Sequence, residues 1–309
     1  MKKTVYIIII FVFVLFYIEM FCRVCDVNFG HTHTDERNTI YQYNDEIGWV
    51  GKPDIDTYYK NIHIVNNDFG FRDINHNYKE KNKKRIMFIG DSFCWGYGVN
   101  QDKIFVELLR NKLTEYELFN CGVSGYGTDQ EYILLKKYYD IIKPDIVFLI
   151  FCCMNDNGEN NTNFVFGGYY KPYYIIKNGE LELQGVPVPK TWLYYKNNFF
   201  VKKSAFIRFL LKQFISYKNK KYSDYVFDNN KTKAIISNMK KYLDENNTEF
   251  VIGFTNEPNL LERYCKKNDI KSVLLENSDI IEKDIHWNEQ GHQFVADKIY
   301  DFLKEKNKI

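Results

Sequence analysis

From about residue 84 onward the chain alternates continuous apolar runs with amphipathic stretches. Four runs are apolar enough to be strands buried on both faces: Arg85 to Ile89, Glu117 to Val123, Asp145 to Met154 and Phe250 to Thr255. Segments with helical spacing lie between and after them, at 104–113, 129–142, 231–246 and 288–307. Strands of this kind alternating with helices predict an α/β fold, a doubly wound parallel sheet with helices on both faces.

One section departs from this alternation. Residues from about 157 to 200 contain a predicted hairpin that turns at Asn178 and Gly179, followed by a segment with Pro187, Pro189 and many aromatic residues. We interpret this section as an aromatic-rich insertion into the main domain, which runs from 84 to 309.

After Lys2 and Lys3, the N-terminal segment is almost entirely apolar. The run from Thr4 to Cys22 is interrupted only by Glu19, and as a helix it rises about 28 Å, close to the thickness of the hydrocarbon core of a bilayer. No small residues follow that would suit cleavage of a signal peptide. Residues 1–24 are therefore predicted to be a signal anchor that spans the lipid bilayer once. Lys2 and Lys3 favour a cytoplasmic N-terminus, with the rest of the chain outside.

Residues 25–83 are polar and rich in turns, which predicts a juxtamembrane linker and an irregular N-terminal extension. Within it, "HTHTDE" brings together the metal-ligand types of His31, His33, Asp35 and Glu36, but no further ligand motif follows, so a solvated linker is favoured. The segment "NNDFGFRD" at 66–73 is predicted to be a turn with Gly70 at its tip.

Composition excludes some classes of function. Forty-two Lys and Arg against 40 Asp and Glu give a formal net charge of +2, too small a field to gather nucleic acid. The seven cysteines follow no disulfide framework and no paired zinc spacing, and they are interpreted as small buried hydrophobic residues. We expect no metal and no organic cofactor.

The candidate chemistry collects at one edge of the predicted sheet, because ligands of open α/β sheets bind beyond the carboxyl ends of the strands. Four loops end there, at 90–92, 120–130, 154–160 and 282–292. They supply the residue types that acyl transfer needs. Ser92 offers a nucleophile, His286 a base and Asp284 an orienting carboxylate, while the Gly125 backbone and the Asn155 amide offer donors for an oxyanion.

These four blocks, "GDS", "NCGVSGYG", "MNDN" and "DIHWNEQGH", resemble in kind and order those of the SGNH (GDSL-type) hydrolases, over roughly residues 84 to 307. The resemblance implies the flavodoxin-like fold of that superfamily. It also implies Ser92 as nucleophile, the Ser92 and Gly125 amides with Asn155 as oxyanion hole, and His286 with Asp284 as the other triad members.

The sequence departs from the family's pattern at two positions. Cys153 stands where the third block usually has Gly. Lys283 stands where the acid often lies, three residues before the histidine, so Asp284 takes that role at the shorter spacing.

Four residues close in sequence to these candidates are expected to have structural roles and not catalytic ones. Asp91 is expected to structure its loop, Asp156 to hydrogen-bond neighbouring loops, Trp287 to pack under the histidine loop, and His292 to be a surface residue of the closing helix.

The predicted function is that of a serine esterase or deacylase acting through an acyl-enzyme on an acylated small molecule or an envelope glycan. One alternative is an O-acyltransferase of cell-surface polysaccharide with the same triad. Another is a non-catalytic glycan-binding or assembly protein that stacks sugars on the aromatic residues Phe164, Phe166, Tyr169, Tyr170, Tyr173, Tyr174 and Trp192.

Overall fold

The fold is that of a computed structural model of the 309-residue chain. It describes residues 2–29, 37–165, 169–195, 198–218, 228, 230–258 and 260–307.

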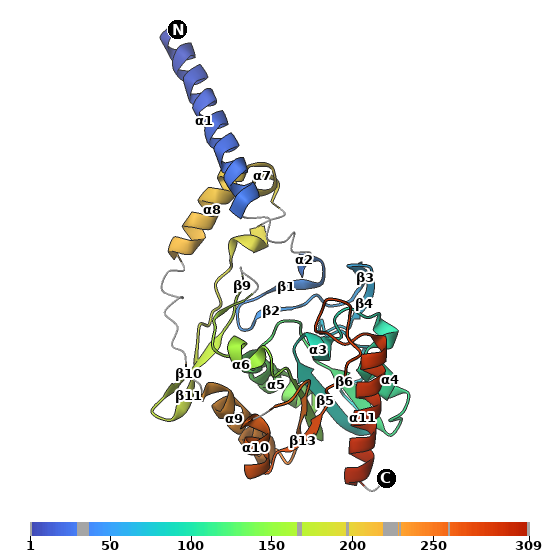
Figure 1. The fold of residues 1–309 in the computed structure, drawn as a ribbon. Coiled ribbons are helices and arrows are strands. Elements are labelled where there is room, and N and C mark those ends of the chain that lie inside the picture. Colours follow the sequence, from blue (N-terminus) through green and yellow to red (C-terminus); the bar gives the residue numbers. More distant parts are fainter. Residues whose placement is uncertain are drawn as a thin grey trace.

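A five-stranded parallel sheet forms the centre of the molecule (Figure 1). Its strands are β5 (Lys84–Gly90), β6 (Tyr116–Asn120), β7 (Ile146–Phe151), β12 (Glu249–Phe254) and β13 (Lys271–Leu274). Their order is β13-β12-β7-β5-β6, so the chain starts near the middle and winds first to one side and then to the other. This is a doubly wound, flavodoxin-like sheet, and it confirms the predicted fold class. Sequence patterning missed only the four-residue strand β13.

Helices cover both faces of the sheet because neighbouring residues of a buried strand point to opposite sides. The helices α5 (Thr128–Ile142) and α9 (Lys231–Glu245) pack on the face that contains Val147 and Ile252. The helices α4 (Phe105–Arg110) and α11 (Glu289–Asn307) pack on the other face, with Phe88 and Phe148. The remaining elements of this region are α3 (Ser92–Trp95), η1 (Gln101–Lys103), α6 (Asp156–Glu159) and α10 (Leu260–Lys267).

The N-terminal extension is more regular than its sequence predicts. After α2 (Arg37–Ile40), two antiparallel hairpins form, β1 (Tyr41–Asn44) with β2 (Gly48–Gly51) and β3 (Ile55–Tyr59) with β4 (Ile62–Asn66). Trp49 and Ile64 are buried in the same cluster as Met87 of the central sheet. The prediction of an irregular extension is wrong, because contacts with the sheet order it. The predicted turn at Gly70 is confirmed, with φ of +82°.

Three of the aromatic rings of the insertion contribute to the core, while Phe164 is 41% exposed and Tyr170 is half-buried. The predicted hairpin is confirmed as β10 (Tyr173–Lys177) and β11 (Glu180–Gln184), preceded by β8 (Phe164–Val165) and β9 (Tyr169–Tyr170) and followed by η2 (Trp192–Tyr195). The rings of Tyr169, Tyr173 and Tyr174 are buried, so they are not open to stack on a sugar. Phe166 and the Trp192 side chain lie outside what the structure describes.

Helix α1 (Lys2–Phe29) extends away from the rest of the molecule (Figure 1). Its segment Lys3–Cys25 contains an 18-residue window with a mean hydropathy of 2.7 that is only 6% buried, and the segment is long and apolar enough to cross a membrane. The helices α7 (Phe199–Lys203) and α8 (Ala205–Lys218) lie where α1 meets the domain, and α8 packs against α1.

The turn from β5 into α3 requires glycine at position 90. A Cβ there would lie 2.7 Å from Cys94 Cβ and 2.7 Å from the backbone oxygen of Ile150. We therefore expect Gly90→Ala to lower the free energy of unfolding by about 2–3 kcal/mol, measured by urea denaturation of the full chain in detergent. Gly158→Ala is the matched control, since a Cβ at Gly158 meets nothing within 4 Å. Equal stability of the two variants would contradict the steric argument.

Candidate active site

Ser92 is the first residue of α3, and only Asp91 separates it from the end of strand β5. The Asp91 carboxylate accepts a hydrogen bond from the backbone N–H of Phe93 at 2.9 Å and so caps this short helix, which confirms its structural interpretation. The β6–α5 loop runs closely against α3, because a Cβ at Gly122 would lie 2.5 Å from the backbone nitrogen of Trp95. Ser92 is thereby fixed at the switch point of the sheet, where β5 and β7 end side by side.

The structure brings Ser92, His286 and Asp284 into one chain of hydrogen bonds. Ser92 Oγ lies 2.7 Å from His286 Nε2, and His286 Nδ1 lies 2.5 Å from Asp284 Oδ1. Asp284 Oδ1 also accepts the backbone N–H of Ile285 at 2.6 Å and that of His286 at 3.2 Å. Partial burial opposes ionisation of Asp284, but the hydrogen bonds from His286 outweigh it and lower the pKa of Asp284. The carboxylate is therefore ionised near neutral pH.

Aromatic rings hold the imidazole of His286 in place. The ring of Phe93 packs on it with centroids 4.9 Å apart, and the ring of Tyr97 with centroids 4.5 Å apart. Trp287 is buried beneath the loop and packs edge-on against Phe93, as its sequence interpretation expects. The imidazole of His286 is thus restrained by two rings from residues 92–99, the segment that carries Ser92 and is called the serine loop below.

The two oxyanion candidates lie in the neighbouring loops. Gly125 is buried in the β6–α5 loop and has φ of +81°, a conformation that favours glycine. Asn155 follows β7, and its Nδ2 donates to Asp91 Oδ2 at 3.2 Å. Asn155 Oδ1 is buried and finds no hydrogen-bond partner among the described residues. Asp91 thus orients the Asn155 amide beside the serine loop.

Buried carboxyl groups lie underneath these loops. Asp156 Oδ2 accepts the backbone N–H of Cys152 at 2.8 Å, a contact within its own loop and not the expected one to a neighbouring loop. Both carboxyl oxygens of Glu131 are buried and have no hydrogen-bond partner within the described part of the chain. Burial, and then the nearby charges of Asp91 and Asp129, raise the pKa of Glu131 well above its ordinary value. Burial likewise raises the pKa of Asp91.

Arg72 is a residue of this region that sequence reasoning missed. Its buried guanidinium donates to the backbone oxygens of Gly96 at 2.5 Å, Val99 at 2.8 Å and His63 at 2.9 Å. It therefore ties the serine loop to the β3–β4 hairpin, and burial lowers its pKa to about 9. The sequence signal that could have found it was a single arginine within 66–73, a stretch otherwise made of turn-forming and apolar residues.

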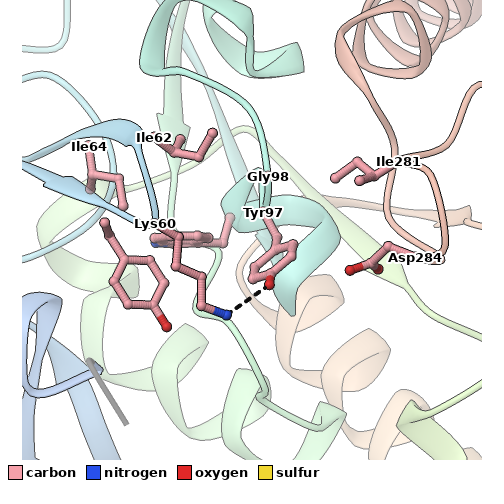
Figure 2. A pocket seen from close by; sticks show the side chains of 9 residues that line it. Lys60, Ile62, Ile64, Tyr97, Gly98, Ile281 and Asp284 are labelled. Carbon is pink, nitrogen blue, oxygen red and sulfur yellow. Dashed lines mark hydrogen bonds between the residues drawn. The ribbon is translucent and has the colours of Figure 1, made fainter. Parts of the chain in front are cut away.

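A largely apolar pocket of about 210 Å³ opens beside Tyr97 and Asp284 (Figure 2). The β3–β4 hairpin supplies one wall, the serine loop the second and the loop before α11 the third. The residues that line it are Tyr59, Lys60, Ile62, Ile64, Trp95, Tyr97, Gly98, Ile281 and Asp284. Lys60 Nζ donates to the Tyr97 hydroxyl at 3.2 Å, as Figure 2 shows. Sequence reasoning had not placed the extension at the site.

His292 corrects one expectation. The sequence predicted a surface residue of the closing helix, but His292 is buried and its Nδ1 accepts the backbone N–H of Phe105 at 3.3 Å. Burial lowers the pKa of His292 to about 3, so the ring is neutral at physiological pH. His292 lies three residues before Val295 and seven before Ile299, so helical spacing already places it on the buried face of α11, and its polar character misled the interpretation.

Metal and disulfide chemistry find little support in the residues that can be described. Among them, no group of three or more His, Cys, Asp or Glu is arranged to hold a metal ion. Cys94, Cys121, Cys152 and Cys265 are free and buried, as expected of small hydrophobic residues, whereas Cys22, Cys25 and Cys153 are only partly buried. The "HTHTDE" segment lies in 30–36, outside the described residues.

Comparison with known proteins finds only weakly similar solved structures, whose names are those of esterases or G-D-S-L lipolytic proteins. No family model and no curated protein matches the chain. An esterase, EstA from Pseudoalteromonas sp., matches with a TM-score of 0.42 and 15% identity, over 74% of this chain and 100% of that one. A lipolytic protein of the G-D-S-L family from Veillonella parvula matches with 0.41 and 13%, over 71% and 97%. The acetyl xylan esterase AlAXEase matches with 0.39 and 14%, over 71% and 99%.

At TM-scores of about 0.4 the likenesses assign no activity, and what the site does is argued from its own geometry. That geometry defines a class: a doubly wound α/β protein with a serine, a histidine and an aspartate in one hydrogen-bonded row at the switch point of its sheet.

The buried carboxyl of Glu131 predicts a pH dependence of stability. Its folded pKa lies well above the ordinary value of 4.5, so above that pH the folded state keeps a proton that the unfolded state loses. The contribution of Glu131 to stability therefore falls as pH rises. We expect the free energy of unfolding of Glu131→Gln, relative to wild type, to rise between pH 5 and 8 by up to about 1.4 kcal/mol per pH unit. Denaturation at each pH measures this.

Glu245→Gln is the matched control, because Glu245 is exposed, and its difference from wild type should stay flat. A flat difference for Glu131→Gln as well would contradict the presence of a neutral carboxyl at this position.

Proposed function

We propose that this protein is a membrane-anchored serine esterase of the SGNH type that cleaves ester bonds through an acyl-enzyme. The observation that carries the proposal is the continuous row from Ser92 Oγ to His286 Nε2 and from His286 Nδ1 to Asp284, with contacts of 2.7 and 2.5 Å. A serine hydroxyl is a weak nucleophile unless an adjacent base accepts its proton, and this geometry provides that base together with its orienting acid.

In the proposed reaction, Ser92 Oγ attacks the carbonyl carbon of the ester while His286 Nε2 accepts the hydroxyl proton. Asp284, ionised near neutral pH, fixes the tautomer with the proton on Nδ1 and stabilises the imidazolium that forms. His286 then passes the proton to the departing alcohol oxygen, leaving the acyl group on Ser92. Water attacks the acyl-enzyme by the same route, which releases the acid and restores the serine.

Negative charge on the carbonyl oxygen needs donors that are already in place. The backbone N–H groups of Ser92 and Gly125 and the side-chain amide of Asn155 take this role in the proposal. The bond from Asn155 Nδ2 to Asp91 leaves the second hydrogen of that amide for the oxyanion. Donors of this kind are each worth about 10² to 10³ in rate, so the fixed orientation of Asn155 matters.

The apolar pocket beside His286 suits the alcohol part of the ester. The departing oxygen must approach His286 Nε2 to receive its proton, and the pocket begins at Tyr97 and Asp284, next to that ring. The half-buried ring of Tyr97 offers aromatic surface, on which the C–H face of a sugar can pack, and Lys60 adds a cation. These features support an acylated glycan as substrate.

The proposed protein is tethered to a membrane. We propose residues 1–24 as anchor, 25–83 as linker and extension, and 84–309 as hydrolase domain with an insertion at about 157–200. The length and hydropathy of Lys3–Cys25 support the anchor, and Lys2 and Lys3 support an N-terminus in the cytoplasm and a domain outside.

Removal of the nucleophile tests the proposal directly. Ser92→Ala should abolish hydrolysis of a chromogenic acetyl ester by the full chain in detergent, and also labelling by a serine-directed fluorophosphonate, because both need the Ser92 oxygen. Ser278→Ala, at an exposed serine away from the row, should keep both. Undiminished labelling of Ser92→Ala would refute the assignment of the nucleophile.

Asp284 lies two residues before His286, whereas the family's acid often lies three residues before the histidine. Its role is therefore tested separately. Asp284→Asn should lower kcat by about 10³-fold or more, because an amide there favours the wrong imidazole tautomer. In the double variant Lys283→Asp, Asp284→Asn, activity should stay low, since Lys283 has φ of +62° and belongs to the turn instead of the row. Recovery of activity in the double variant would move the acid to position 283.

A further inference from the structure

The outward side of helix α8 is apolar, the reverse of what a helix on a water-soluble domain presents. Phe209, Leu210, Phe214 and Tyr217 are 48, 49, 64 and 81% exposed. Leu210, Phe214 and Tyr217 recur at helical spacing, so they share one face. The opposite side contains the buried residues Ala205 and Ile215 and faces the protein.

The preceding helix continues this surface. Phe199 and Phe200 of α7 are both largely exposed, and α7 packs against the start of α8. We call the exposed side chains Phe199, Phe200, Phe209, Leu210, Phe214 and Tyr217 the α7–α8 apolar surface.

This surface is joined to the candidate membrane anchor. Glu19 of α1 accepts hydrogen bonds from the backbone N–H groups of Ala205 at 2.9 Å and Phe206 at 3.0 Å, and from the Ser204 hydroxyl at 2.7 Å. Arg23 pairs with Glu19 at 2.8 Å and donates to the Lys203 backbone oxygen at 2.7 Å. The one acidic residue in the apolar run thus caps the start of α8.

The depth of this joint follows from the length of the anchor. The apolar run that matches the hydrocarbon thickness ends at Cys22, three residues after Glu19, which is about 4.5 Å along the helix axis. The start of α8 therefore lies at the boundary between hydrocarbon and headgroups whenever α1 spans a bilayer.

The charges of the segment suit the same location. Residues 198–218 contain five basic residues and no acidic one: Lys202, Lys203, Arg208, Lys212 and Lys218. An apolar helix face with basic residues around it is typical of helices that lie in the interface of a membrane containing anionic lipid.

We propose that the α7–α8 apolar surface inserts into the interfacial region of the phospholipid bilayer that α1 crosses, as a second membrane contact. This inference rests on the anchor part of the proposed function and is independent of the esterase chemistry. With two contacts joined through Glu19, the catalytic domain is held in one orientation to the membrane and does not swing freely on a single helix.

Site-directed photocrosslinking tests this in the full chain. The chain is reconstituted into nanodiscs of phosphatidylcholine and phosphatidylglycerol, with p-benzoylphenylalanine in place of Phe214. Matched probes replace Tyr58, which is 70% exposed on the β3–β4 hairpin, and Phe11, which is 60% exposed in the middle of α1. The probe at 214 should form at least about fivefold more phospholipid adduct than the probe at 58.

The probe at Phe11 separates the two levels of the proposal. Lipid adduct at 11 with none above background at 214 would overturn the second contact and leave the anchor intact. Absence of lipid adduct at 11 would overturn the anchor and this inference with it. A crosslinked dimer from position 214 in place of lipid adduct would assign the surface to a second copy of the chain and overturn the proposal.

Discussion

The absence of a side chain at Gly90 is the constraint on which the site depends. Strand β5 is paired on both sides, with β6 and β7, and the chain must leave it by turning at once into α3. This turn brings Cys94 Cβ and the Ile150 backbone oxygen to 2.7 Å from where a Cβ at position 90 would lie. The tight turn keeps Asp91 buried, where it caps α3 and orients Asn155. It also places Ser92 at the switch point of the sheet, between β5 and β7. The loops after β6 and β7 and the segment before α11 all reach it there.

A second requirement is that the loop after α3 keeps its shape, and a buried charge provides this. Arg72 bonds three backbone oxygens at once and packs its guanidinium over the Trp95 ring at 4.8 Å. Burial of a guanidinium opposes folding, as its lowered pKa indicates, and only a full set of acceptors offsets that cost. The N-terminal extension is therefore part of the site, because the same arginine that shapes the serine loop also binds His63 of the hairpin that forms the pocket wall.

Sequence patterning predicted those parts of the fold that depend on neighbouring residues. Continuous apolar runs located four of the five strands, and the loop after β5 located Ser92. The segment before the closing helix located His286 and Asp284, which the structure brings together with Ser92. What it missed depends on distant contacts. The hairpins of the extension are short and polar in sequence, and packing against the central sheet orders them. The joint between Glu19 and α8 links residues 185 apart. His292 is different, since it lies three residues before Val295 on the apolar face of α11 and was misjudged because histidine is polar.

The short spacing between acid and base is explained by the backbone around Asp284. Its Oδ1 accepts the N–H groups of the next two residues as well as His286 Nδ1, so the side chain folds back over its own turn. An acid three residues before the histidine would lie at Lys283, whose left-handed backbone belongs to the same turn. The aspartate is thus oriented by local hydrogen bonds and needs no partner from another loop. This local fixing compensates for its partial exposure, because a carboxylate that water reaches is otherwise free to rotate away from the imidazole.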